Sequence, residues 1–107
     1  MALSKDYVTQ EPARAKIDAL NGSTVLEFGT GWCGYCQAAQ PHIAEAFADY
    51  PQVSHIKVED GPGRPLGRSF RVKLWPTLVF LKEGKEVARL VRPQGAAEIG
   101  AALRQIA

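Results

Sequence analysis

The sequence predicts an α/β fold in which a central mixed sheet of four to five strands is flanked by helices on both faces. Two observations predict it. Apolar, strand-like runs alternate with helix-like stretches along most of the chain, and the last two strand-like runs are joined by a tight turn before a final helix. With 107 residues, of which 46% are hydrophobic, the chain has room for one domain with one core.

The N-terminal half alternates between expected strands and helices. A short first strand is expected at Tyr7 to Thr9, and the periodic apolar residues that follow predict a helix from Pro12 to Leu20. The compact apolar run Val25 to Phe28 is typical of a central strand buried on both faces. The next helix is expected from Gly34 to Asp49, with a kink at Pro41, because proline removes a helical hydrogen bond.

The C-terminal half ends in a hairpin and a helix. Alternation predicts a strand at Val53 to Val58, and a short helix is expected at Leu66 to Phe70. A second apolar strand, Thr77 to Leu81, turns back into an antiparallel edge strand at Val87 to Val91. Apolar residues at i, i+4 and i+7 predict the last helix, Ala96 to Ile106.

The only two cysteines, Cys33 and Cys36, lie at the expected junction of a strand and a helix. A C-x-x-C motif in this context predicts a reversible dithiol/disulfide centre. Two other interpretations are an inert buried pair and half of a zinc site. Zinc usually takes four ligands, and the only histidines, His42 and His55, fall on different elements without paired spacing. We therefore expect no metal.

Charge and hydropathy exclude several classes of function. A formal net charge of +2 is too small to indicate nucleic-acid binding, and the cluster of Arg64, Arg68, Arg71 and Lys73 is interpreted as a solvated basic loop. No apolar run is long enough to span a membrane, and the N-terminus has no hydrophobic signal region. Two cysteines in one C-x-x-C fit a cytosolic redox protein, so we expect a cytoplasmic location.

The chain resembles the thioredoxin family through four features at the family's spacing. They are the W-C-G-x-C motif at Trp32 to Cys36, a carboxylate (Glu27) six residues before the first cysteine, Pro41 five residues after the second, and Pro76-Thr77 followed by an apolar strand and the turn at Lys82 to Gly84. The resemblance covers nearly the whole chain. It implies one thioredoxin-like domain over residues 1–107, the thioredoxin fold, thiol–disulfide oxidoreductase activity on protein disulfides, and no bound cofactor.

The two cysteines are expected to act in order. Cys33 should begin a helix, where unpaired N–H groups and the helix dipole favour a thiolate, and so should attack a substrate disulfide first. Cys36 lies about one helical turn further on, so its sulfur returns to the same side and resolves the mixed disulfide. Gly34 keeps the turn between them uncrowded.

Glu27 is the second catalytic candidate. A carboxylate in an apolar strand is costly to bury when ionised, so its pKa is expected to be raised. The resemblance implies a position beneath Cys36 as a proton acceptor, although the family more often has aspartate there. Lys57 occupies the place of a family lysine near that carboxylate and is expected to be its charge partner. The other interpretations are an edge-strand glutamate and a lysine that both face water.

The resemblance also implies a substrate-binding rim around the cysteines. We expect it to comprise Trp32, Gly34, Tyr35, Trp75, Pro76 and Thr77. Pro76 should be cis, since X-Pro is the only bond for which cis costs little, and should lie against the disulfide. Tyr35 stands where thioredoxins have proline and is expected to make the disulfide more oxidising. Gly29 replaces a common aromatic and should leave space near the active site.

The expected partners are proteins that contain disulfides, with a thioredoxin reductase or glutathione as the electron donor, and the chain is expected to be a monomer. Two alternative functions stay open from the sequence. One is a glutathione-coupled, oxidase-like or isomerase-like dithiol protein, suggested by Tyr35 between the cysteines. The other is a thioredoxin-fold module that holds a client protein without catalysis, using Trp32 and Trp75.

Overall fold

The computed structural model describes residues 6–107, and within them it has four helices and four strands. In chain order they are α1 (Arg14–Asp18), β1 (Ser23–Gly29), α2 (Gly34–Phe47), β2 (Ser54–Glu59), α3 (Pro65–Ser69), β3 (Thr77–Lys82), β4 (Lys85–Val91) and α4 (Ala96–Ile106). The predicted alternation of strands and helices and the closing hairpin are confirmed. Within the described residues, every helix is too short or too polar to cross a membrane.

The four strands form one mixed sheet in the order β2-β1-β3-β4. β1 runs parallel to β2 and antiparallel to β3, and β4 pairs antiparallel with the outer side of β3. β1 therefore has a strand on each side, and every residue from Thr24 to Gly29 is buried, as the compact apolar run predicted. A charged side chain in this strand needs partners inside the protein.

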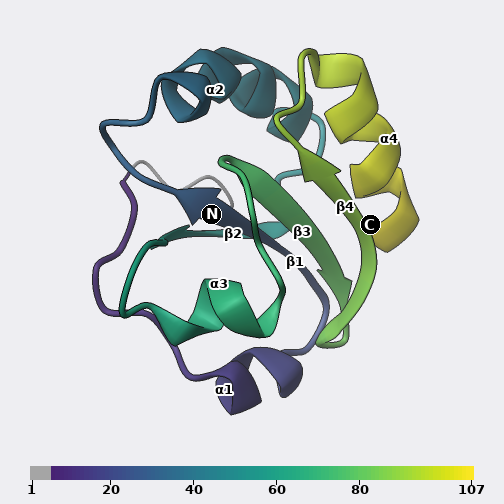
Figure 1. Ribbon diagram of the computed structural model, residues 1–107. Coiled ribbons are helices and arrows are strands. Elements are labelled where there is room, and N and C mark those ends of the chain that lie inside the picture. The colour runs from purple at the N-terminus through teal and green to yellow at the C-terminus, as the bar shows by residue number, and fades with distance from the viewer. Residues whose placement is uncertain (1–5) are drawn as a thin grey trace.

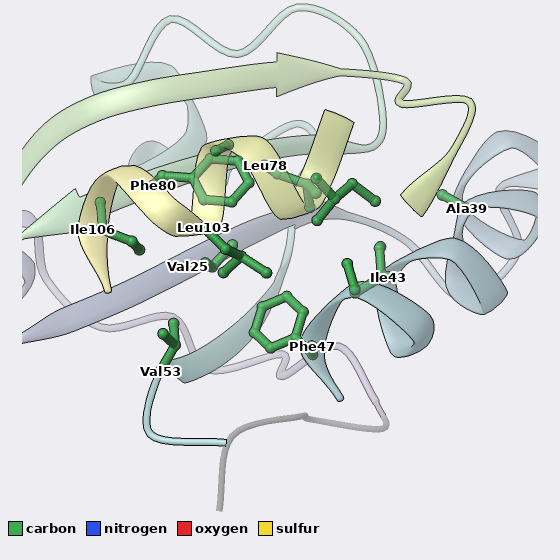
Figure 2. Close-up of a cluster of buried hydrophobic side chains, with 12 residues drawn as sticks. Val25, Ala39, Ile43, Phe47, Val53, Leu78, Phe80, Leu103 and Ile106 are labelled. Atoms are coloured by element: carbon green, nitrogen blue, oxygen red, sulfur yellow. The ribbon is translucent and has the colours of Figure 1, made fainter. Parts of the chain in front are cut away.

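Helices cover both faces of the sheet, with α2 and α4 on one side and α1 and α3 on the other (Figure 1). Each face has its own core, because alternate residues of a strand point to opposite sides. The core under α2 and α4 is drawn in Figure 2 and includes Val25, Ala39, Ile43, Phe47, Val53, Leu78, Phe80, Leu103 and Ile106. The core under α1 and α3 comprises Ile17, Leu26, Phe28, Val58, Leu66, Phe70, Val79 and Leu81.

The N-terminal segment is not the strand that was expected at Tyr7 to Thr9. It makes a single parallel bridge between Val8 and Val58. The Val8 N–H donates to the Lys57 carbonyl at 2.8 Å, and the Glu59 N–H donates to the Val8 carbonyl at 3.0 Å. These two bonds tie the backbone next to Tyr7 to β2, which brings a segment without regular structure close to the sheet.

Several element boundaries differ from the expectation by one or two residues. α1 begins at Arg14 rather than near Pro12, and its N-cap side chain makes no hydrogen bond to hold an earlier start. β4 begins at Lys85 because the hairpin turn needs only two residues. Glu83 and Gly84 have φ values of 50° and 78°, and a two-residue turn with both φ values positive matches the twist of the strands.

We expect Leu103→Ala to lower the free energy of unfolding by about 2–5 kcal/mol, because it leaves a cavity in the core under α2 and α4. The leucine is fully buried, whereas Leu74 is 48% exposed. Leu74→Ala removes the same atoms and should change stability by less than about 0.5 kcal/mol. Urea unfolding of both variants measures the difference. Equal losses would contradict this description of the core.

Candidate active site

The two cysteines lie at the start of α2, as predicted, and both are free thiols. Cys33 is the N-cap residue, and its Sγ accepts a hydrogen bond from the Cys36 N–H at 3.2 Å. Cys33 is 8% exposed and Cys36 1%. The more exposed of the two cysteines is therefore the one at the helix N-terminus, where N–H groups favour a negative charge.

Cys36 is in a different environment although it is only three residues further on. Burial raises the pKa of Cys36 from 9.0 to about 11, and the hydrogen bond with Cys33 contributes to that rise. Cys36 is therefore a thiol at neutral pH. It has to lose this proton before its sulfur can act as a nucleophile.

Glu27 lies in β1, and its side chain is fully buried. Its Oε2 accepts hydrogen bonds from the Tyr7 hydroxyl and from Nε2 of Gln40, the latter at 2.8 Å. Its Oε1 lies 2.9 Å from Nε2 of His55, whose side chain is also fully buried. The strand thus holds a carboxylate whose two oxygens both have partners in the protein.

These partners set the charge of Glu27. Burial raises its pKa, because water no longer solvates the carboxylate. The hydrogen bonds from His55, Tyr7 and Gln40, together with the electrostatic interaction with His55, outweigh burial and lower the pKa of Glu27 below its ordinary value of 4.5. The expectation of a raised pKa is wrong, because it considered burial without the partners.

The direction of this shift fixes its effect on stability. The pKa of Glu27 is lower in the folded protein than in the unfolded chain. The ionised carboxylate therefore stabilises the fold above about pH 4.5, and this contribution is lost as the pH falls through the folded pKa.

Lys57 lies opposite Glu27 in the register of β1 and β2 and is 4% exposed. Its Nζ donates to Oε1 of Gln40 at 3.0 Å, and the amide of Gln40 in turn donates to Glu27. The same Nζ lies 4.4 Å from the centre of the Tyr7 ring. Gln40 thus connects the lysine to the carboxylate, and the interpretation of a lysine facing water does not hold.

Gly29 does not leave open space beside the site, contrary to the expectation. A Cβ at this position would lie 2.6 Å from Sγ of Cys36 and 2.8 Å from the hydroxyl oxygen of Tyr7. The volume that a side chain would fill is occupied by these two groups. Glycine at the end of β1 therefore allows the Tyr7 hydroxyl and the Cys36 thiol to approach each other.

An aromatic rim surrounds the exposed side of the cysteines. Trp32 and Tyr35 are 75% and 60% exposed. The Trp32 ring meets the edge of Trp75 with centroids 5.8 Å apart, and Nε1 of Trp75 donates to Asp60 at 2.9 Å. On the other side, the Arg92 guanidinium lies 3.8 Å from the centre of the Tyr35 ring. Trp32 and Tyr35 thus offer apolar surface next to Cys33.

The remaining residues of the predicted rim have different environments. The Trp75–Pro76 bond is cis, as predicted. Thr77 is buried, and its hydroxyl donates to the Leu74 carbonyl at 2.6 Å, so this side chain faces inward. Gly34 is exposed, and a Cβ there would meet no atom within 4 Å.

Three members of the site were not singled out from the sequence, namely Tyr7, Gln40 and His55. One signal pointed to His55. The alternation of β2 puts it on the same face as Val53 and Lys57, and Val53 is fully buried. Among residues 6–107, no group of three or more His, Cys, Asp or Glu side chains could hold a metal ion.

A hollow of about 400 Å³ adjoins the buried thiol. It is lined by Tyr7, Thr30, Cys36, Gln40, Lys57 and Glu59, among others. Glu27 does not line it, so Tyr7 and Gln40 stand between the carboxylate and this hollow. The Thr30 hydroxyl is buried and has no hydrogen-bond partner among the described residues. Most of the side chains that line the hollow are polar, whereas the rim near Cys33 is aromatic.

Comparison with known proteins places these features in a family. The family model described as Thioredoxin matches residues 5–105. The solved structure of thioredoxin 2 from Pseudomonas aeruginosa PAO1 in its reduced form is 59% identical, with a TM-score of 0.87, and the match covers 97% of this chain and 96% of that one.

Curated relatives are more distant. A thioredoxin H-type from Fagopyrum esculentum is 34% identical over 67 residues, which are 63% of this chain and 58% of the relative. A thioredoxin from Chlamydia trachomatis is 36% identical over 72 residues, which are 66% of this chain and 70% of the relative. The chain thus spans little more than half the length of the Fagopyrum protein.

We expect Gly29→Ala to destabilise the protein by about 1–3 kcal/mol, since the new methyl group has to displace Tyr7 or Cys36 from a packed site. Gly31→Ala is the matched control, because a Cβ there meets no atom within 4 Å. It should leave stability unchanged or raise it by up to about 1 kcal/mol. Urea unfolding compares the two. If Gly29→Ala is as stable as Gly31→Ala, the Tyr7 hydroxyl and the Cys36 sulfur do not both lie where a side chain at position 29 would be.

Proposed function

Because the chain belongs to the thioredoxin family, we propose that it is a thiol–disulfide oxidoreductase that reduces disulfide bonds in other proteins. One observation carries the proposal. The more exposed cysteine caps a helix, and three residues further on Cys36 lies beside the Tyr7 hydroxyl, which donates to the ionised Glu27 carboxylate. Nucleophile, resolving thiol and proton acceptor thus lie within one site, as two successive thiol–disulfide exchanges require.

The reaction proceeds in two exchanges. The Cys33 thiolate attacks one sulfur of the substrate disulfide, and the other substrate sulfur leaves as a thiolate. Cys36 then loses its proton and attacks Sγ of Cys33, which releases the second substrate thiolate. Two electrons have passed to the substrate, and Cys33 and Cys36 are joined by a disulfide. Glu27 acts in the second exchange as the acceptor of the Cys36 proton.

The other site residues have supporting roles in this proposal. Trp32, Tyr35, Trp75 and Pro76 form the surface on which the substrate lies, with Gly34 and Thr77 shaping the backbone beside it. Their support is the exposure of Trp32 and Tyr35 next to Cys33. Lys57 acts through Gln40, whose amide it holds toward Glu27.

We also propose which partners the protein has and where it acts. Its substrates are proteins with accessible disulfides, and a thioredoxin reductase or glutathione returns electrons to the oxidised pair. The protein acts as a monomer in the cytoplasm. The support for the location is the use of both cysteines in one C-x-x-C, which suits a reducing compartment.

Insulin reduction by dithiothreitol tests the activity. The protein is expected to accelerate precipitation of the insulin B chain, whereas Cys33→Ser should reduce the rate to that of dithiothreitol alone, because the attacking sulfur is lost. Cys36→Ser is the companion variant. It keeps Cys33 and should accumulate a mixed disulfide with the substrate that mass spectrometry detects. A wild-type protein no faster than Cys33→Ser would rule out the enzymatic function.

A further inference from the structure

The Tyr7 side chain lies between the buried thiol and the buried carboxylate. Its hydroxyl donates to Oε2 of Glu27 and lies beside the Cys36 thiol. The hydroxyl oxygen and the Cys36 sulfur are the two atoms nearest to the position of a Cβ on Gly29, at 2.8 and 2.6 Å. Tyr7 thus makes a continuous chain of polar groups from Cys36 to Glu27.

We propose that Tyr7 is a catalytic residue that relays the proton of the Cys36 thiol to Oε2 of Glu27 during the second exchange. This inference rests on the proposed function, because a relay is needed only if Cys36 attacks a mixed disulfide. It adds a residue from an irregular segment, 26 residues before the first cysteine, to the catalytic group.

The hydrogen bond from Tyr7 to Glu27 has the direction that a relay requires. A phenol has one proton to donate and lone pairs to accept with. Because the Tyr7 proton goes to Glu27, the lone pairs of the Tyr7 oxygen are available to accept the Cys36 proton. Nζ of Lys57 lies 4.4 Å from the centre of the Tyr7 ring and helps to hold it. Because Gly29 has no side chain, the Tyr7 hydroxyl has room beside Cys36.

The resting protonation states agree with this direction. Burial raises the pKa of Cys36 to about 11, so the donor carries its proton at neutral pH. Hydrogen bonds lower the pKa of Glu27, so the acceptor is ionised. Burial, with the nearby charge of Glu27, raises the pKa of Tyr7 and keeps the relay group a neutral phenol. These values oppose full transfer before attack, so the proton moves as Cys36 forms its new bond.

In this step two protons move, and one S–S bond replaces another. The Cys36 S–H bond breaks as its proton goes to the Tyr7 oxygen, and the original Tyr7 proton goes to Glu27. The Cys36 sulfur uses its electron pair to bond with Sγ of Cys33, and the bond from Cys33 to the substrate sulfur breaks. The substrate sulfur leaves with that electron pair. Glu27 later loses its proton through Tyr7, which lines the hollow beside Cys36.

The test measures the second exchange by stopped flow in the intact chain, using a peptide disulfide and comparing wild type with Tyr7→Phe. The wild-type rate should be nearly constant between about pH 6 and pH 9, because thiol and carboxylate keep their protonation states there. Tyr7→Phe should be about 100-fold slower at neutral pH. Its rate should rise about tenfold per pH unit, since only solvent base then removes the proton.

The comparison isolates the Tyr7 hydroxyl. The other titratable groups that face this chain of polar groups are Cys33 on α2, His55, Lys57 and Glu59 on β2, and Asp6 at the hollow, and both proteins keep them all. Tyr50→Phe, which removes a hydroxyl beyond the far end of α2, is the control and should keep the wild-type rate and profile. Glu27→Gln should show the same rising profile as Tyr7→Phe, and combining the two should slow the step no further.

A second measurement separates failure of the relay from failure of the proposed function. In a Cys36→Ser background, adding Tyr7→Phe should leave the rate of mixed-disulfide formation at Cys33 unchanged, because the first exchange needs no relay. If the mixed disulfide forms but Tyr7→Phe alone keeps the wild-type rate and flat profile in the second exchange, the relay is overturned and the function stands. If no mixed disulfide forms at Cys33, the proposed function itself fails.

Discussion

The rest of the site depends on the hydrogen bonds that the protein makes to the Glu27 carboxylate, which is buried in the inner strand β1. Moving an ion out of water without partners costs on the order of several kcal/mol, so a charged Glu27 is possible only where the protein supplies hydrogen bonds to it. His55, Tyr7 and Gln40 supply them from three different parts of the chain. The same contacts put a base within reach of a thiol that burial keeps protonated.

The fold explains why these groups meet. β1 is an inner strand, and its parallel pairing with β2 sets Lys57 opposite Glu27 and His55 two residues earlier on the same face. α2 follows β1 after a short loop and lies over one face of the sheet (Figure 1). It carries Cys36 and Gln40, and the Gln40 amide donates to Glu27. The bridge from Val8 to β2 holds the N-terminal segment near the site. Sheet register, one helix and one backbone bridge are sufficient to assemble the network.

Much of the architecture could be predicted from local patterns. The last helix shows its apolar spacing directly, and the C-x-x-C at a strand–helix junction predicted Cys33 at a helix start. The environment of Glu27 could not be predicted, because its partners lie 20, 13 and 28 residues away. Tyr7 was missed for the same reason, since its segment has no periodicity and is positioned by contacts with residues far away in the sequence, such as the bridge from Val8 to Val58. Local signals identify elements, whereas charge states depend on contacts between them.

A carbon-13 NMR titration of the Glu27 side-chain carboxyl in the reduced protein measures its charge, and the Glu27→Gln spectrum assigns the signal. We expect a midpoint below 4.5, with the carboxylate ionised at neutral pH. A midpoint above about 7 would mean that Glu27 is a neutral acid in the resting protein because burial outweighs the hydrogen bonds, and Glu27 could then not accept the Cys36 proton.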